Sequence, residues 1–275
     1  MGDDRTVHDR LRTYGRDAFG EARLREAKAG RTVAVCIPAR DEAATVGRVV
    51  DAVRRPHVAA AGGSGLVDDV LVVDDGSRDA TAQVARAAGA RVLRLGERTG
   101  KGGAMRAGLD GCDGDLVVYL DADVQDTSAA FVTGLVGPLL GGTDIALVKG
   151  FYDRPIEGSR TGGGRVTELV ARPLLEVLFP DLTGVRQPLA GETAAPRWAL
   201  EELTFAPGYG VEIGLLIDVA ARFGVQAIAQ VDLGTRAHRN RSLDELRPQA
   251  VEVLRAALAR SHPRLDPGPP ATASL

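Results

Sequence analysis

The sequence predicts an α/β fold built around a mostly parallel sheet, and three observations lead to this prediction. Short apolar runs rich in β-branched residues alternate with stretches whose apolar residues recur at helical spacing. Polar, often acidic, turns follow several of the apolar runs. The chain has 275 residues, of which 44% are hydrophobic, enough for the core of one large domain. Strands that alternate with helices are joined by right-handed crossovers, which make the sheet parallel.

The expected elements follow one another in a regular order. Strands are expected at 32–37, 70–73, 91–95, 115–120, 144–149 and 225–231. Helices are expected after the first strand, at 79–88, up to about 110, between the fourth and fifth strands, and at 166–178, 196–203, 211–223 and 243–260. In the first of these helices, valines between Val46 and Val53 recur at helical spacing, and Asp41 or Thr45 can cap it.

Composition and the chain ends narrow the class of protein. Residues 1–28 are expected to form an N-terminal helical extension that packs weakly, and residues 261–275 a disordered tail. The net charge of −3 argues against a nucleic-acid or membrane-surface partner. The two cysteines have neither metal-ligand nor disulfide spacing. Because we find neither a secretory signal nor an apolar run long enough to span a bilayer, a cytoplasmic protein is expected.

The most informative segment is the apolar run 116–120, which ends on Asp121, Ala122 and Asp123. Residues two apart on a strand point to the same face, so the two carboxylates would converge at the strand's carboxyl end. Ligands bind at that edge in open α/β sheets. Paired carboxylates there suit Mg²⁺ or Mn²⁺ holding a diphosphate. The alternative is a polar turn that merely ends the strand.

Polar residues also follow the first two strands. Pro38–Glu42 and Asp74–Ser77 offer carboxylates that can accept hydrogen bonds from a nucleobase or a ribose. A helix cap at Asp41 and a tight turn at Asp75 explain the same residues without a ligand. The functional interpretation is favoured by Lys101, in an expected loop at 96–103, together with the two later aspartates. A dinucleotide-binding dehydrogenase is not indicated, because no G-x-G-x-x-G follows the first strand.

Three features of the second half could also belong to a site. Gly164, Arg165 and Thr167 precede or open an expected helix, whose amino end attracts anions; a hinge loop is the alternative. His238 lies among arginines and is either a metal ligand or a surface histidine. Glu212 opens a helix, where the helix dipole alone favours an acidic residue.

Together these segments resemble known families. The runs PARDEAATVG, VVDDGSRDAT, KGGA and LDAD resemble the nucleotide-sugar half of GT-A glycosyltransferases. Downstream, GGGRVTELVARPLL, QPLAGE, PGYGVEIGLLID and RAHRNR resemble the glucosyl-3-phosphoglycerate synthase family, retaining enzymes of actinobacteria. The resemblance covers roughly residues 10–260. It implies a GT-A type nucleotide-binding sheet in residues 29–150 and a helical, acceptor-binding C-terminal part in residues 151–260.

The resemblance also implies roles for individual residues. The donor would be held by Pro38, Ala39, Glu42, Asp75, Lys101, Asp121 and Ala122. Glu212, Asp123 and Lys101 would serve catalysis, and Asp123 with His238 would hold Mg²⁺ or Mn²⁺. The acceptor would be held by Gly164, Arg165 and Thr167. Ala122 departs from the serine of the family, which affects a donor contact but keeps both carboxylates.

The expected function is transfer of glucose from UDP-glucose to the 2-hydroxyl of 3-phosphoglycerate with retention, in a homodimer. One alternative is a mannosyl-3-phosphoglycerate synthase that uses GDP-mannose. Another is an inverting family-2-like glycosyltransferase with a different acceptor. Those enzymes commonly carry Gln-x-x-Arg-Trp, and here Ala194 stands at the glutamine position before Arg197 and Trp198. A non-catalytic nucleotide-binding regulator is a further alternative, which measuring UDP release would test.

Overall fold

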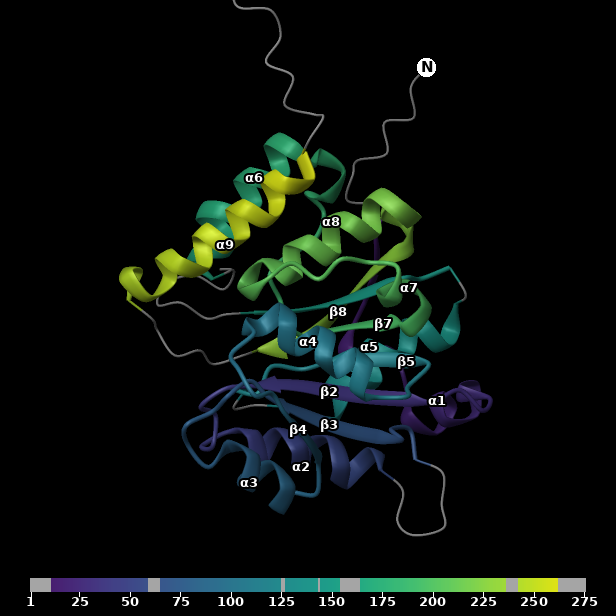
Figure 1. The fold of residues 1–275 in the computed structure, drawn as a ribbon. Coiled ribbons are helices and arrows are strands. Elements are labelled where there is room, and N and C mark those ends of the chain that lie inside the picture. Colours follow the sequence, from purple (N-terminus) through teal and green to yellow (C-terminus); the bar gives the residue numbers. More distant parts are fainter. Residues whose placement is uncertain are drawn as a thin grey trace, which may run out of the picture.

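An eight-stranded sheet runs through the described part of the molecule (Figure 1). The computed structural model describes residues 11–58, 65–124, 127–142, 144–153, 164–235 and 242–261. The strands are β1 (Arg12–Tyr14), β2 (Val33–Ala39), β3 (Asp69–Asp74), β4 (Arg91–Arg94), β5 (Leu116–Tyr119), β6 (Leu147–Asp153), β7 (Thr193–Pro196) and β8 (Ile228–Thr235). Their order is β1-β8-β6-β7-β5-β2-β3-β4. Within this sheet β7 is antiparallel to β5 and β6, and the other pairs are parallel, which confirms the predicted fold class.

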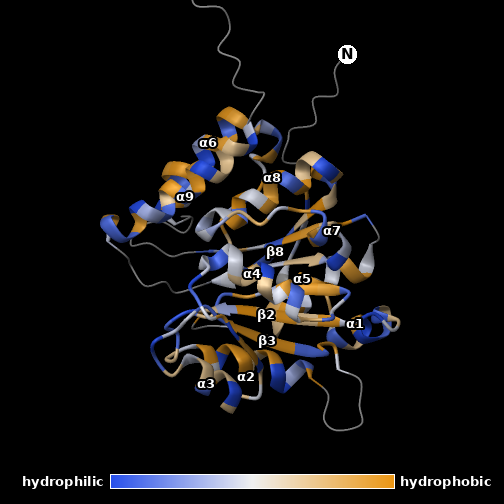
Figure 2. Cartoon of the chain, in the orientation of Figure 1, coloured by the Kyte–Doolittle hydropathy of each residue, from blue (hydrophilic) through white to orange (hydrophobic). Residues whose placement is uncertain are grey.

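Helices cover both faces of the sheet. One layer holds α1 (Glu21–Lys28), α2 (Val46–His57), α3 (Thr81–Ala87) and α5 (Ala129–Gly141). The other holds α4 (Gly100–Gly111), α6 (Arg172–Leu178), α7 (Arg197–Glu201), α8 (Val211–Phe223) and α9 (Leu243–Ser261). Alternate residues of a strand enter different cores: Val35 packs toward the first layer and Cys36 toward the second. Because both faces are covered, hydrophobic residues fill most of β2 in Figure 2.

The N-terminal segment packs more tightly than the sequence suggests. β1 adds a strand to the sheet by pairing in parallel with β8. In α1, Leu24 is buried, and the Nζ of Lys28 donates a hydrogen bond to the carbonyl oxygen of Gly65 at 3.1 Å. The expectation of a weakly packed, helical extension is therefore corrected for residues 11–28. Residues 1–10 and 262–275 lie outside the described residues.

Several boundaries differ from the prediction. α8 spans 211–223 as expected, whereas the expected helix at 166–178 begins with a π-helical segment, Thr167–Ala171. The short strand β7 was not predicted. Thr45 is the N-cap of α2, but its side chain makes no capping hydrogen bond. Asp41 adopts a left-handed backbone conformation (φ 55°) four residues earlier and does not cap the helix either.

Candidate active site at the carboxyl edge of the sheet

The loops after β2 and β3 hold each other in place at the carboxyl edge of the sheet. The backbone N–H of Asp41 donates to Ser77 Oγ, and that of Glu42 donates to Thr81 Oγ1. In return, a carboxylate oxygen of Asp41 accepts a hydrogen bond from the backbone of Arg78 at 2.7 Å. These contacts satisfy backbone groups that a loop would otherwise expose, and they fix the edge where a nucleotide is expected to bind.

Pro38 and Ala39 belong to β2 itself and not to the loop after it. Both residues pair with β3, opposite Val73 and Asp74. The pairing of β2 with β5 ends at Cys36, so the proline lies where β5 no longer runs beside the strand. A proline is tolerated at this place because its missing N–H costs no ladder hydrogen bond to β5. Ala39 is 4% exposed, so a ligand would meet its backbone more than its side chain.

The Asp75 carboxylate holds the start of α4. It accepts hydrogen bonds from the backbone N–H groups of Thr99 and Gly100, at 2.6 and 2.9 Å, and from the Thr99 hydroxyl at 3.0 Å. Only 5% of Asp75 is exposed. A carboxylate at the amino end of a helix satisfies unpaired N–H groups and faces the positive end of the helix dipole. The structure thus gives Asp75 a role in placing α4, and its contact with a donor stays a prediction.

Two glycines allow α4 to approach the segment before α8. A Cβ on Gly102 would lie 1.9 Å from the carbonyl oxygen of Ala206. A Cβ on Gly100, where φ is +75°, would lie 3.3 Å from the Cα of Gly208. A side chain at position 102 would push the segments apart, and at position 100 the positive φ favours glycine. The contact brings the first turns of α4 and α8 together.

Lys101 joins carboxylates from two distant parts of the chain. It lies in the first turn of α4 and not in a loop, because the helix begins at Gly100. Its Nζ is 2.6 Å from Asp121 Oδ1 and 2.5 Å from Glu212 Oε1. Burial alone would lower the pKa of Lys101, but the two carboxylates outweigh burial and hold that pKa well above its ordinary range. Lys101 is therefore a cation at neutral pH and is 18% exposed at this edge.

Asp121 and Asp123 lie in the turn after β5, which ends at Tyr119. Strand alternation therefore does not relate the two carboxylates, and the expectation that they converge as neighbours on one strand face is corrected. Asp121 is half-buried against Lys101, whereas Asp123 is exposed. Ala122 between them is buried.

The carboxylate of Asp123 is a hard oxygen ligand of the type that Mg²⁺ and Mn²⁺ accept, and its exposure lets a cation reach it. Among the described residues, no group of three or more His, Cys, Asp or Glu side chains could hold a metal ion. The predicted ligand His238 lies outside the described residues. Asp123 thus offers one ligand of a suitable kind among the described residues, and the shared metal site with His238 stays a prediction.

β7 brings a further acidic residue to the site. Because this strand is antiparallel to β5, its amino end lies at the carboxyl end of β5, where Thr193 pairs with Tyr119. A Cβ on Gly191 would lie 2.2 Å from Asp121 Oδ1, so the turn before β7 contacts the aspartate directly. Glu192, next in the chain, has no exposed surface.

Lys149 belongs to the same group of charges and was not predicted. It lies within β6, is 2% exposed, and its Nζ donates to the carbonyl oxygen of Ala190 at 2.5 Å. Burial lowers the pKa of Lys149 to about 8; Lys101 also lowers it, while Glu212, Glu192 and Asp121 oppose the shift. The one signal in the sequence is a lysine that ends an apolar run, which is equally typical of the end of a strand.

The predicted acceptor residues lie at the start of the described range 164–235. The carbonyl oxygen of Gly164 accepts a hydrogen bond from the backbone of Glu168 at 3.0 Å, so the helical turns begin directly after this glycine. Arg165 is exposed and Thr167 is 6% exposed. π-helical turns are frequent at functional sites, and this one begins at Thr167. The contacts of these residues with an acceptor stay a prediction.

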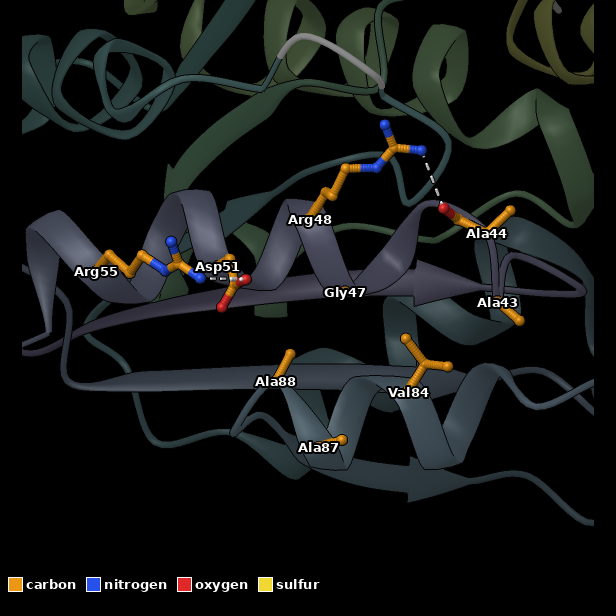
Figure 3. Close-up of a pocket in the computed structure, with 9 residues that line it drawn as sticks. All are labelled: Ala43, Ala44, Gly47, Arg48, Asp51, Arg55, Val84, Ala87 and Ala88. Atoms are coloured by element: carbon orange, nitrogen blue, oxygen red, sulfur yellow. Dashed lines mark hydrogen bonds and ion pairs between the residues drawn. The ribbon is translucent and has the colours of Figure 1, made fainter.

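A groove in the other helical layer lies apart from these residues. Figure 3 shows it between α2 and α3, where Arg48 bonds to the carbonyl oxygen of Ala44 and Arg55 to Asp51. None of the predicted site residues lines this groove. No helix in the part of the chain that the structure describes is long and apolar enough to cross a membrane.

The carboxyl edge combines a lysine cation with carboxylates that can accept hydrogen bonds from sugar hydroxyls. The Lys101 ammonium can neutralise negative charge on a departing phosphate group. Glu212 is 5% exposed and is bound to that cation, so its carboxylate is placed to accept hydrogen bonds from sugar hydroxyls or to stabilise positive charge on a sugar carbon.

The chain is similar to glycosyltransferases over most of its length. The model of glycosyl transferase family 2 matches residues 34–184. A glucosyl-3-phosphoglycerate synthase of Mycobacterium tuberculosis is 50% identical over 262 residues, which are 90% of this chain and 79% of that protein. The glucosyl-3-phosphoglycerate synthase of Mycolicibacterium smegmatis is 46% identical, over 90% of this chain and 84% of that protein.

Solved structures match the fold as well. The M. tuberculosis synthase in complex with Mn²⁺, UDP-glucose and phosphoglyceric acid has a TM-score of 0.83 and 49% identity, over 91% of this chain and 87% of that one. The complex with Mn²⁺, UDP and glucosyl-3-phosphoglycerate also has a TM-score of 0.83, with 48% identity, over 91% of this chain and 88% of that one. The chain described above therefore belongs to glycosyl transferase family 2 and to the glucosyl-3-phosphoglycerate synthases.

Proposed function

We propose that this protein transfers glucose from UDP-glucose to the 2-hydroxyl of 3-phosphoglycerate, with retention at the anomeric carbon. The observation that carries the proposal is the Lys101 cluster, in which the donor half supplies Lys101 and Asp121 and the second half supplies Glu212. The family supports the choice of substrates, because its structures contain UDP-glucose, phosphoglyceric acid and glucosyl-3-phosphoglycerate.

The donor binds at the ends of β2, β3 and β5 in this proposal. Pro38, Ala39, Glu42 and Asp75 face the uridine, and Lys101 faces the diphosphate. Lys101 stays protonated because its two carboxylate partners hold its pKa high, so its positive charge is in place before the diphosphate departs. Glu212 orients the glucose and stabilises the positive charge that develops on its anomeric carbon.

Asp123 and His238 would hold Mn²⁺ or Mg²⁺ beside the donor diphosphate. Such a cation neutralises the charge that grows on the departing UDP. Asp123 is exposed next to Asp121, and the carboxylate chemistry fits either metal. Because imidazole is a softer ligand than carboxylate, it binds Mn²⁺ at least as well as Mg²⁺.

The acceptor binds at the start of the helix that contains Thr167. Arg165 is exposed there and can form paired hydrogen bonds to a phosphate or carboxylate. Gly164 lets the acceptor come close to the backbone, and Thr167 offers its hydroxyl for a hydrogen bond. Fixing both negative groups of 3-phosphoglycerate places its hydroxyl close to the anomeric carbon, which lowers the entropic cost of the reaction.

A donor panel tests this proposal. UDP-glucose, GDP-glucose and GDP-mannose are each offered with 3-phosphoglycerate, in the presence of Mn²⁺ or Mg²⁺. We expect UDP release with UDP-glucose to exceed nucleotide release with either GDP sugar. The proton coupling constant at the anomeric carbon of the product identifies an α- or β-linkage. Turnover only with GDP-mannose, or a β-linked product, would contradict the proposal.

We further propose a functional division at about residue 150. Residues 29–150 bind the nucleotide sugar and residues 151–260 bind the acceptor, with residues 11–28 packed onto the sheet and α9 ending at Ser261. We also propose that the reaction takes place in the cytoplasm.

The assembly that we propose is a homodimer formed through α6, α9 and the π-helical segment between Thr167 and Ala171. These elements pack against one another and lie side by side in Figure 1. Large apolar side chains remain exposed on them: Leu169, Val177, Leu243 and Leu258. Several large apolar side chains left exposed on packed helices favour an interaction surface there.

Light scattering after size-exclusion chromatography tests the assembly. We expect a dimer at micromolar concentration, and a monomer for the double variant Val177→Glu and Leu258→Glu. A monomeric parent protein, or a dimeric double variant, would rule out this interface.

A further inference from the structure

Lys149 is a buried cation that the proposed mechanism does not use. It lies at the centre of the sheet, opposite Thr193 of β7 and Gln230 of β8. Only 2% of Lys149 is exposed, against 18% for the Lys101 side chain. Lysine is almost never fully buried in proteins unless it is paired, so its presence here needs a reason.

The Nζ of Lys149 binds a turn that contacts the site. It donates to the carbonyl oxygen of Ala190 at 2.5 Å. The next residue, Gly191, approaches Asp121 so closely that a Cβ would lie 2.2 Å from its Oδ1. Lys149 therefore holds, through one backbone carbonyl, the turn against which Asp121 packs.

From Asp121 the contacts continue to both other members of the cluster. Its carboxylate is 2.6 Å from Lys101 Nζ, and Lys101 Nζ is 2.5 Å from Glu212. The charges also act on Lys149 through space, since Glu212, Glu192 and Asp121 each favour its protonated form while Lys101 opposes it. Lys149 thus adds a second, buried lysine to this group of interacting charges.

We propose that Lys149 is a positioning residue for the donor: by holding the turn 190–192 against Asp121, it fixes the Asp121–Lys101–Glu212 cluster in the arrangement that binds the nucleotide sugar. This inference rests on the function proposed above. Because Lys149 is only 2% exposed, we assign its effect to the turn and to its charge and not to a contact with substrate.

Two substitutions at Lys149 test this inference by steady-state kinetics. Lys149→Met keeps the length of the side chain but removes its charge and its hydrogen bond, whereas Lys149→Gln keeps a donor group. For Lys149→Met we expect kcat/KM for UDP-glucose to fall about tenfold, the scale of losing one hydrogen bond from a charged group. The KM for UDP-glucose rises and the KM for 3-phosphoglycerate stays within about twofold, because the cluster contacts the donor. The kcat/KM and KM values of Lys149→Gln for UDP-glucose are expected to lie between those of Lys149→Met and of the parent protein.

Gly191→Ala tests the same path from its other end. The added methyl displaces Asp121 while Lys149 remains intact, so the same rise in the KM for UDP-glucose is expected. Lys28→Met is the matched control, because Lys28 is also a buried lysine bound to a backbone carbonyl but lies in α1, away from the site. It is expected to lower the melting temperature and to leave both KM values unchanged.

A purely structural role gives a different result. Lys149→Met would then reduce kcat only in proportion to the folded fraction seen by circular dichroism, with both KM values unchanged, and this outcome overturns the proposal. If Lys149→Met does not fold, the same comparison of KM values is made with Lys149→Gln. If neither variant folds, this result also counts against the proposal. Calorimetry can measure the affinity for UDP in the presence of Mn²⁺ without any catalytic reaction. We expect this affinity to fall about tenfold in Lys149→Met. The binding measurement therefore tests the role of Lys149 independently of the proposed reaction. If the parent protein is inactive with UDP-glucose and 3-phosphoglycerate, only the proposed reaction is refuted.

Discussion

The donor half and the second half of the molecule build their parts of the site in different ways. In the donor half, parallel strands end at one edge, and the loops that follow them hold each other through short side chains such as Ser77 and Asp75. In the second half, Glu212 and Thr167 lie on helical turns, and β7 enters between two strands of the sheet in the opposite direction. The first half is thus organised by hydrogen bonds between the loops at the ends of its parallel strands, and the second by packing against the first. Substitutions in the two halves should therefore have different effects on activity and substrate binding.

The largest effect is expected for Asp123→Ala, at the end of the donor half. Removing this carboxylate, and with it the proposed metal, should lower kcat/KM about a thousandfold or more, because charge on the departing diphosphate is no longer neutralised. The measurement is UDP release during titration with Mn²⁺. His238→Ala in the second half is expected to give the same loss. Asp110→Ala, an exposed aspartate on α4, is the control. Near-normal turnover of either site variant at saturating metal would contradict the assignment.

The next effect is expected where the two halves meet, at Glu212. Glu212→Gln keeps the shape of the side chain but removes the charge next to Lys101. We expect kcat to fall about a hundredfold, as for other groups that stabilise charge in a transition state, while UDP still binds. Steady-state kinetics and calorimetry with UDP separate the two effects. Glu201→Gln, at the exposed end of α7, should be neutral. A Glu212→Gln variant with unchanged kcat would leave the carboxylate a structural role only.

Arg165→Ala tests whether acceptor binding belongs to the second half. Loss of its paired hydrogen bonds should raise the KM for 3-phosphoglycerate by about ten- to a hundredfold, and the KM for UDP-glucose by less than twofold. Initial rates measured with each substrate varied in turn provide both constants. Arg247→Ala, an exposed arginine on α9, serves as the control. Equal changes in the two KM values would remove the acceptor role of Arg165.

The smallest effect on turnover is expected in the donor half, at Asp75. Asp75→Ala removes three hydrogen bonds that place the start of α4, so it should lower the free energy of unfolding by about 2 kcal/mol. Because Asp75 faces the uridine in the proposed function and also places the helix that begins just before Lys101, we expect a rise of a few-fold in the KM for UDP-glucose. Urea denaturation and donor kinetics measure the two quantities. Asp75→Asn, which keeps one acceptor oxygen, should lie between Asp75→Ala and the parent. Unchanged stability would show that α4 is placed without Asp75.

The sequence predicts the donor half better than the second half, for physical reasons. The alternation of strands and helices and the acidic turn at Asp121 are local patterns, so both could be predicted. The contact of Lys101 with Glu212 depends on glycines that let two distant segments approach, and no spacing in the sequence encodes it. β7 was missed because Thr193–Pro196 is short and contains alanine and proline, which have low strand propensity. Lys149 was missed because burial of a lysine becomes visible only in the packed fold.

The pairing of β1 with β8 has a consequence for how the molecule forms. The side chain of Gln230 donates to Thr13 across 217 positions of the chain. During synthesis, residues 12–14 leave the ribosome long before residues 228–235, so their partner strand does not yet exist when they emerge. Contacts between such remote segments slow folding, because a long loop must close before they stabilise anything. We therefore expect the edge of the sheet at β1 to be among the last parts of the protein to assemble.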